Sequence, residues 1–382
     1  MKDYVGDIRR IFLLLVALLL IGNPPALSAG KEAPSVEYVT GTVLTVQSLE
    51  TPNNKNKALG SKNLLTIQLT SGEESGKQVM SINHLTNQPF FDINPGPGDN
   101  IILALNEVQG VKEYHVADYN RLSSLYILVG VFCLSLLILG KKIGVKTLFV
   151  IGFSIYIILE GMIPFILDYH WNFILTTLLV CAIITAVTQI TISGWNPKTW
   201  GAILGTVGGV VIAGILSGIA IQWMHLTGLD SEEAMMLKAT TLSFINFQEV
   251  LFAGIILGSL GAVMDVTISI ASSQYEIKKS CPNYGFSEIF QAGINVGRDV
   301  MGTMANTLIL AYTGSSLPLI FLIASQTNIS LTRIMNLNIV VTEITRAITG
   351  SIGLIISIPL TAAITAYFLS RKDDKEVTDV VI

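Results

Sequence analysis

Long apolar segments with almost no charge recur along the chain after residue 122. Each approaches the roughly 20 residues that a helix needs to cross a hydrocarbon core about 30 Å thick. We place membrane-spanning helices near residues 123–140, 147–167, 173–192, 200–223, 248–272, 300–323 and 345–369. Only 13% of the residues are charged, whereas a soluble domain carries about a quarter. The segments therefore predict a multi-pass, all-α transmembrane helix bundle of about seven spans.

The first apolar segment, residues 11–20, is of a different kind. Arg9 and Arg10 precede it, prolines follow at positions 24 and 25, and small residues lead to a cleavage-like position near Ala29. A basic start, a short apolar stretch and small residues are typical of a secretory signal peptide, which we assign to residues 1–29. The alternative is an uncleaved signal anchor. In either case the residues that follow lie outside the cytoplasm.

Residues 30–122 differ from the rest of the chain and favour β-strands. "LLTIQLT" and "KQVMSIN" flank the turn-forming "SGEESG", and "NIILALN" and "KEYHVAD" flank "EVQG". Two β-rich segments joined by Gly-containing loops predict a hairpin. "VEYVTGTVLTV" alternates over only part of its length. We predict a small antiparallel extracytoplasmic β domain in the form of a five-stranded barrel, followed by the transmembrane domain at 123–370 and a cytoplasmic tail at 371–382.

The distribution of basic residues predicts the orientation of the spans. Cytoplasmic connections of membrane proteins are enriched in Lys and Arg. If the β domain lies outside, the inner connections hold Lys141, Lys142, Lys146, Lys198, Lys278, Lys279, Arg298, Arg371, Lys372 and Lys375. The outer ones hold only Lys238 and Arg333, with Arg346 at a boundary. This bias predicts a cell-membrane protein with its C-terminus in the cytoplasm and agrees with the signal peptide.

Polar residues in the fifth and sixth spans fall in stripes. At 100° per residue, Asp299, Thr303, Asn306, Leu310 and Thr313 lie within about 40° of one direction. In the fifth span, seven small or acidic residues lie within about 60° of one another. They are Gly254, Gly258, Gly261, Asp265, Ser269, Ser272 and Glu276. An aspartate in contact with lipid costs roughly 2.5 to 3.5 kcal/mol on insertion scales, so we expect these stripes to contact protein or water.

The two stripes are expected to meet. The fifth span enters from outside and the sixth from inside, so Asp265 and Asn306 can lie at the same depth. Arg298 and Asp299 should then approach Ser272 and Glu276 at the inner boundary. We predict a polar seam between the two helices that contains Asp265, Ser269, Glu276, Arg298, Asp299, Thr303 and Asn306. The seam is either a pathway for a solute or only a means of holding the helices together.

Two motifs in these spans carry a family resemblance. "LGAVMDVTISIASSQYEI", residues 260–277, and "NVGRDVMGTMANTLILAYTGSSLP", residues 295–318, resemble the signature region of the YibE/F family of bacterial multi-pass membrane proteins. The resemblance extends over roughly residues 123–370. The family's motif residues correspond to Asp265, Ser269, Ser272, Glu276, Gly297, Arg298, Asp299, Met301, Gly302, Thr303, Asn306, Thr307 and Tyr312. The resemblance implies a location and an architecture, and it implies no particular activity.

Motifs for catalysis and metal binding are missing from the sequence. It contains no Walker A, H-E-x-x-H, G-x-S-x-G or dinucleotide-binding motif, each of which marks a known chemistry. Its three cysteines offer no disulfide framework to the β domain, and His84 and His115 lack metal-ligand spacing. We therefore expect no cofactor, no bound metal and no enzymatic activity.

Two classes of function remain. The first is a permease-like transporter that moves a small polar solute or ion along the seam. The alternative is a non-transport membrane scaffold or sensor whose β domain binds a partner. The expected partners are the lipid bilayer, a small polar solute or ion, and a membrane protein or a second copy of the chain. No nucleic acid is expected.

The predicted orientation can be tested with fusions. A reporter that is active only in the cytoplasm should work when it is fused after Lys372 and fail when it is fused near Gly60, because the basic connections remain inside. Enzymatic activity of the reporter in intact cells is the measurement. Activity at Gly60 alone would show that the topology is inverted.

Overall fold

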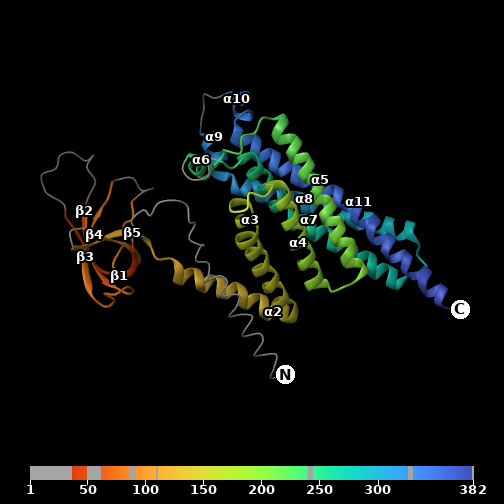
Figure 1. Ribbon diagram of the computed structural model, residues 1–382, viewed down its shortest axis with the longest axis horizontal. Coiled ribbons are helices and arrows are strands. Elements are labelled where there is room, and N and C mark those ends of the chain that lie inside the picture. The colour runs from red at the N-terminus through yellow and green to blue at the C-terminus, as the bar shows by residue number, and fades with distance from the viewer. Residues whose placement is uncertain are drawn as a thin grey trace, which may run out of the picture. The chain divides into compact units, whose positions relative to one another are not determined.

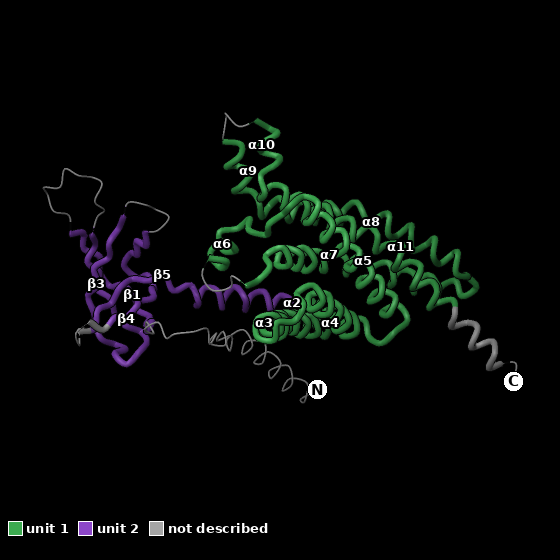
Figure 2. The backbone as a smooth tube through the Cα atoms, turned by 45° about the horizontal axis from the view of Figure 1, so that its top comes forward, with its two compact units in different colours: residues 1–25, 139–382 green, residues 26–138 purple. Residues whose placement is uncertain are grey.

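The computed structural model describes residues 37–49, 62–86, 92–108, 111–239, 244–325 and 330–380. The signal peptide predicted at residues 1–29 lies outside these ranges. The chain divides into two compact units, which Figure 2 colours separately. One contains the β-strands and the first part of helix α2, and the other contains the remaining helices.

The β unit is a five-stranded antiparallel sheet (Figure 1). Its strands are β1 (Glu37–Ser48), β2 (Lys62–Leu69), β3 (Gln78–His84), β4 (Asn100–Val108) and β5 (Val111–Tyr119), in the order β3-β2-β1-β4-β5. The small antiparallel sheet and both predicted hairpins, β2–β3 and β4–β5, are confirmed. β1 pairs with both hairpins and has an irregular register between Val43 and Thr45. An extra residue there reverses the alternation, which explains why β1 alternates over only part of its length.

The edge strands of this sheet approach each other. The hydroxyl of Ser81 on β3 donates a buried hydrogen bond of 2.6 Å to the carbonyl oxygen of Tyr114 on β5. The sheet thus curls around a core that includes Val43, Leu65 and Leu103. Five strands closed in this way form a small, partly open barrel comparable to the OB-fold.

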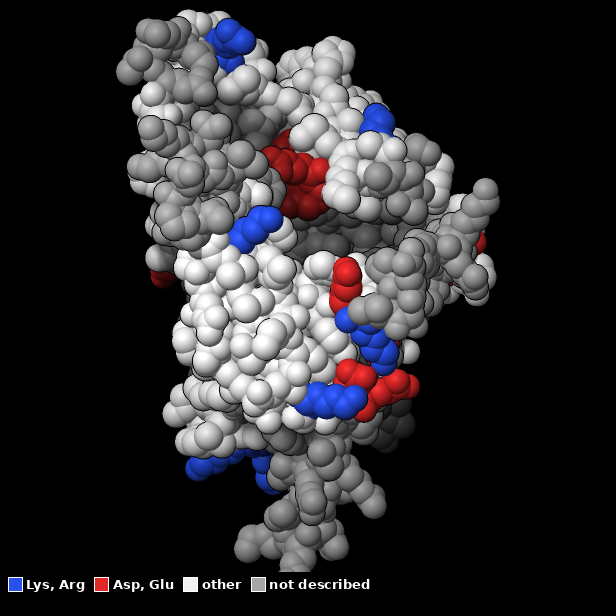
Figure 3. Space-filling view, turned by 90° about the vertical axis from the view of Figure 1, so that its left-hand side faces the viewer, with Lys and Arg blue, Asp and Glu red and all other residues white. Residues whose placement is uncertain are grey.

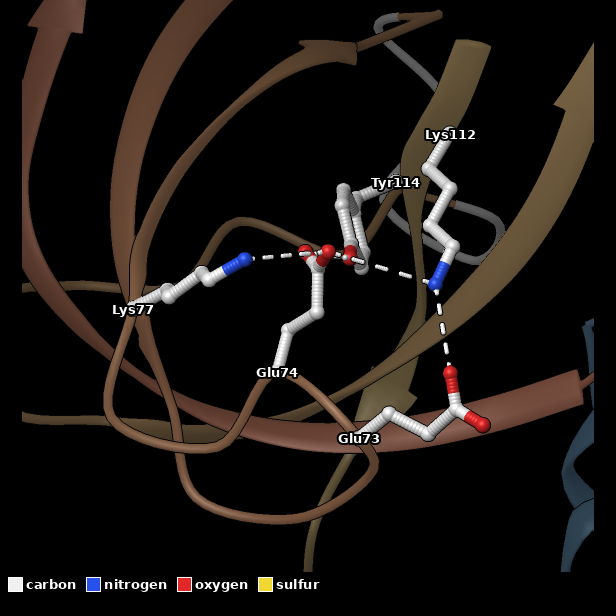
Figure 4. A network of polar contacts seen from close by, with 5 residues as sticks. All are labelled: Glu73, Glu74, Lys77, Lys112 and Tyr114. Carbon is white, nitrogen blue, oxygen red and sulfur yellow. Dashed lines mark hydrogen bonds and ion pairs between the residues drawn. The ribbon is translucent and has the colours of Figure 1, made fainter. Parts of the chain in front are cut away.

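A polar network fastens the β2–β3 turn to β5 (Figure 4). The Tyr114 hydroxyl donates to Oε2 of Glu74 at 3.0 Å, and Nζ of Lys77 lies 3.2 Å from Oε1 of the same carboxylate. Lys112 reaches Glu73 at 3.6 Å and Glu74 at 4.0 Å. The hydrogen bond from Tyr114, followed by that from Lys77, lowers the pKa of Glu74 below its usual value of 4.5. Burial, followed by the hydrogen bond to Glu74, raises the pKa of Tyr114.

The helical unit begins with a long interrupted helix. α2 (Leu122–Tyr156) continues through the π-helical turn η1 (Ile157–Met162) into α3 (Ile163–Leu167). The backbone leaves the helical region at Lys141, with φ 48° and ψ −121°. The 46 residues of Leu122–Leu167 would measure about 69 Å as one straight helix, more than twice the hydrocarbon thickness. The stretch therefore consists of two helices that meet at Lys141, and the spans predicted at 123–140 and 147–167 correspond to these two helices.

The later helices begin and end at recognisable signals. They are α4 (Phe173–Ser193), α5 (Pro197–Trp223), α6 (Glu232–Ala239), α7 (Phe247–Ser280), α8 (Phe286–Ser315), α9 (Leu317–Ala324), α10 (Leu331–Met335) and α11 (Asn338–Val380). Asn172 and Asn246 cap α4 and α7 by accepting hydrogen bonds from backbone N–H groups. Pro197 starts α5, where its missing N–H costs nothing. Gly194 ends α4 with φ 78°, a value that glycine adopts without strain.

Among the described residues, five helical segments are long and apolar enough to cross a membrane. They are Leu122–Leu167, Phe173–Ser193, Pro197–Trp223, Phe247–Ser280 and Asn338–Ser370. α8 and α9, which are bent by 63° relative to each other, add a sixth if they count as one span. The transmembrane helix bundle is thus supported, while the count of seven stays a prediction. Figure 3 faces the β unit, on which Lys, Arg, Asp and Glu side chains are scattered among uncharged described residues.

Helices α5, α7, α8 and α11 pack side by side (Figures 1 and 2). The closest approach is between α5 and α11, where an added methyl group at Gly201 or Gly205 would overlap Thr365 or Thr361. At Gly209, an added Cβ would lie 2.6 Å from Cβ of Ser357. Small residues allow such close backbone approach, which is a main source of helix association in membranes.

The acid sensitivity of the β unit should depend on the Tyr114–Glu74 hydrogen bond. A lowered folded-state pKa stabilises the fold above the unfolded-state pKa, and that stability is lost as pH falls through the folded-state pKa. Tyr114→Phe should lower the melting temperature of the isolated 30–120 fragment by a few degrees near neutral pH. The difference from wild type should shrink below about pH 4. Thermal circular dichroism measures it, and a difference that does not change with pH would contradict the assignment.

The α5–α11 contact predicts different outcomes for two glycines of the same helix. Gly205→Leu should destabilise the full chain by about 3 kcal/mol or more, because the new side chain would push α11 away. Gly218→Leu is the matched control, because no atom lies within 4 Å of an added Cβ there. Thermal stability in detergent, read by fluorescence-detected size-exclusion chromatography, compares the two. Equal stability would show that this packing is unimportant.

Candidate functional site

The helices that carry the predicted site, α7 and α8, form an antiparallel hairpin. Between them, Nζ of Lys278 donates to the carbonyl oxygens of Pro282 and Tyr284 at 2.6 and 2.9 Å. Glu288 accepts a hydrogen bond of 3.0 Å from the Gly285 N–H group at the start of α8. The basic end of α7 and the acidic start of α8 also suit the helix dipoles. The hairpin turn is therefore tightly fastened.

Three contacts set the register of this hairpin. Nε2 of Gln274 donates to the carbonyl oxygen of Ile289 at 2.9 Å. Further along, Ile270 lies against Gly297. The Tyr312 hydroxyl oxygen lies against Gly258, 2.7 Å from the position of a Cβ added to that glycine. Counting along the two antiparallel helices between these contacts places Asp265 at about the same height along the hairpin as Thr303. Ser269 lies at about the same height as Asp299. The expected partner at the depth of Asp265 was Asn306, which lies three residues, or about 4.5 Å, further along α8 in this register.

All seven predicted site residues are exposed on this chain. They are Asp265, Ser269, Glu276, Arg298, Asp299, Thr303 and Asn306, and together they are called the polar face below. Among the described residues, no hydrogen bond between two side chains and no ion pair joins any two of them. The enclosed seam expected between α7 and α8 is not formed within one chain. The reason is that the helices meet through other residues, with Gly293 against Gln274 and Gly297 against Ile270 and Ile358.

The expected group of Arg298, Asp299 and Glu276 is also not formed. Arg298 is about level with Ile270, and Glu276 lies six residues further along α7. At 1.5 Å per residue the difference in level is about 9 Å. The prediction assumed that the spans pack with their apolar midpoints level, whereas α7 extends to Ser280 and α8 begins at Phe286. Arg298 and Asp299 lie instead near the level of Ser269.

The polar face has open space beside its carboxylate. No atom lies within 4 Å of a Cβ added at Gly254, Gly261 or Gly302. Gly254 and Gly261 lie on the same side of α7 as Asp265, so the helix surface there is flat and accessible. Ser269 turns its hydroxyl back to the carbonyl oxygen of Asp265 at 2.7 Å, which leaves the carboxylate itself free. Such a face can accommodate a hydrated solute or another protein surface.

The buried polar residues of α7 were missed by the analysis of the sequence. Gln274 is fully buried, and its Nε2 donates at 2.9 Å to carbonyl oxygens of both Ile289 on α8 and Ala362 on α11. Thr267 shares a buried hydrogen bond of 2.6 Å with Thr206 on α5. These residues point away from the stripe of carboxylates, and a search for acidic and small residues overlooks them. Their role is to join α7 to its neighbours.

A second charged group lies at the opposite end of the bundle from the α7–α8 turn. Nη1 of Arg346 donates to Oε1 of Glu343, its neighbour three residues earlier on α11, at 2.8 Å. The Tyr312 hydroxyl is buried and has no hydrogen-bond partner among the described residues. Within the described ranges, no group of three or more His, Cys, Asp or Glu is placed to hold a metal ion.

Comparison with known proteins identifies the family. A family model described as YibE/F-like protein matches residues 128–371. No curated protein and no solved structure matches the chain. The matched region covers more than half of the chain and contains the two motifs on α7 and α8. It confirms the resemblance that those motifs carry, and the chain belongs to the YibE/F-like family.

Proposed function

We propose that this protein is a permease-like transporter that moves a small polar solute or ion along the polar face of α7 and α8. The observation that carries the proposal is the exposed Asp265 carboxylate, partway along an apolar helix and beside the open glycines Gly254 and Gly261. Ionisable groups within spans are costly and usually belong to substrate or ion pathways. The family and the apolar helices support a membrane protein.

The polar face needs a covering in the membrane. One chain leaves it exposed, and lipid contact would leave its charged and amide groups without partners. A second copy of the chain is the simplest covering, since small residues on α7 permit close approach of another helix. The pathway would then run between two copies, with Asp265 as its principal charge and Arg298 and Asp299 as an inner gate. No enzymatic activity or cofactor is part of this proposal.

A specific observation favours the alternative, a scaffold or sensor that acts through its β domain. Met80 and Ile82 on β3 are 71% and 48% exposed. OB-folds bind their ligands across strands 2 and 3, and paired positions on β2 place Thr66 and Leu64 beside these residues. An apolar strip there could bind an external partner. The transporter remains the first choice, because such a role would not require a carboxylate within the span.

A charge-neutral substitution tests the transporter. Asp265→Asn keeps the size and hydrogen bonding of the side chain and removes its charge. In proteoliposomes screened with pools of charged solutes by solid-supported membrane electrophysiology, the wild type should give a current for at least one pool. Asp265→Asn should reduce that current at least about tenfold, because the pathway loses its main charge. Insertion and thermal stability should stay close to wild type.

Two further variants identify the alternatives. Met80→Ser with Ile82→Ser on β3 should leave the current unchanged if transport depends on the helices. A fully active Asp265→Asn, together with an Asp265→Leu variant that is lost through misfolding, would show that Asp265 is structural. In that case the scaffold or sensor function would be favoured over transport.

A further inference from the structure

A cavity of about 610 Å³ lies at the end of the bundle where α7 begins and α8 ends. Its walls come from the loop before α6, the first turns of α7, the α8–α9 bend and the start of α11. The 63° bend between α8 and α9 turns the chain away from the α8 axis and contributes to this opening. The volume is within the range of about 300 to 1,000 Å³ that is usual for small-molecule sites.

The wall from α11 contains an incompletely bonded ion pair. The side chains of Glu343 and Arg346 are only 20% and 25% exposed, and a single hydrogen bond of 2.8 Å joins them. Oε2 of Glu343 and Nε of Arg346 are buried and have no hydrogen-bond partner in the described part of the chain. A buried ion pair is costly unless further hydrogen bonds satisfy its remaining groups. This pair therefore leaves hydrogen-bonding capacity unused at the cavity.

A second carboxylate lines the same cavity without a cation of its own. Asp230 is half-buried there, and its side chain makes no hydrogen bond or ion pair with the described residues. The guanidinium of Arg346 is already bonded to Glu343, so the cavity has one carboxylate in excess. The other walls are largely apolar and include Val250, Leu251 and Leu319. The charges thus favour a cation, and the apolar walls favour one with a hydrocarbon part.

We propose that this cavity binds a small organic cation with a primary ammonium group and an apolar body. The ammonium would donate to the Asp230 carboxylate, and the apolar part would lie against Val250 and Leu251. A metal ion is a poorer fit, because the described residues offer no group of three metal ligands. The cavity contains none of the seven residues of the polar face, although Gly254 lies beside both, and ligand binding in it does not depend on whether a solute moves along that face.

The test uses phenethylammonium as the probe and the full chain in lipid nanodiscs. Equilibrium dialysis of the radiolabelled amine measures the Kd without any need for transport. 2-Phenylethanol and 3-phenylpropanoate serve as neutral and anionic comparisons of similar shape. The wild type should bind the amine saturably and at least about tenfold more tightly than either comparison, as expected for charge-assisted hydrogen bonds.

Variants of the cavity and of the polar face distinguish the two proposals. Asp230→Asn and Gly254→Leu should each weaken amine binding at least about tenfold, the first by removing the charge and the second by filling the cavity. Gly261→Leu is the matched control for Gly254→Leu, because both glycines have open space beside them but only Gly254 lines the cavity. Gly261→Leu and Asp265→Asn should both bind the amine with the wild-type Kd, whatever effect these two variants have on transport.

Three results would overturn the proposal. The first is the absence of saturable amine binding by folded wild-type protein. The second is equal or tighter binding of the alcohol or the acid. The third is a wild-type Kd for the amine in both Asp230→Asn and Gly254→Leu. A probe whose affinity depends on neither the charge nor the volume of the cavity binds elsewhere.

Discussion

The close contact between α5 and α11 is the constraint on which the helical unit depends. Lipid tails are as apolar as leucine, so helices in a membrane associate through close packing and hydrogen bonds rather than through the hydrophobic effect. Four successive levels bring small residues together: Gly201 with Thr365, Gly205 with Thr361, Gly209 with Ser357 and Ala213 with Gly353. The hydroxyl of Thr361 donates to the Ser357 carbonyl oxygen at 2.7 Å. Polar atoms can therefore be present here without a partner from α5.

The rest of the fold illustrates what local patterns can predict. Hydropathy located every long helix, and hairpin signals located four of the five strands, because both depend on residues adjacent in the chain. The interruption at Lys141 and the π-helical turn η1 have a different origin. Lys141 was placed in a connection between two predicted spans, whereas the backbone there departs from the helical region at a single residue. The bend after Ser315 does have a local signal, since Pro318 disfavours a continuous helix.

The site was predicted less completely, and the reason lies in the packing of three helices. Helical periodicity placed Asp265 and Ser269 on one side of α7, and Asp299 and Asn306 on one side of α8, as observed. It could not determine which side of each helix would be buried. Gly293 and Gly297 give α8 a second small-residue face, and α11 packs there through Ile358 and Ala362. Only the three-dimensional arrangement shows that this face is used and that the acidic one is left open.

The four levels between α5 and α11 also limit how the two helices could move. On both helices the contact residues repeat every four positions, so a shift of one helical turn would bring Gly205 opposite Ser357 and Gly209 opposite Gly353. A smaller shift would push hydroxyls and methyl groups against the neighbouring backbone. Packed helices of this kind change position in discrete steps. The α5–α11 pair is therefore rigid against gradual sliding.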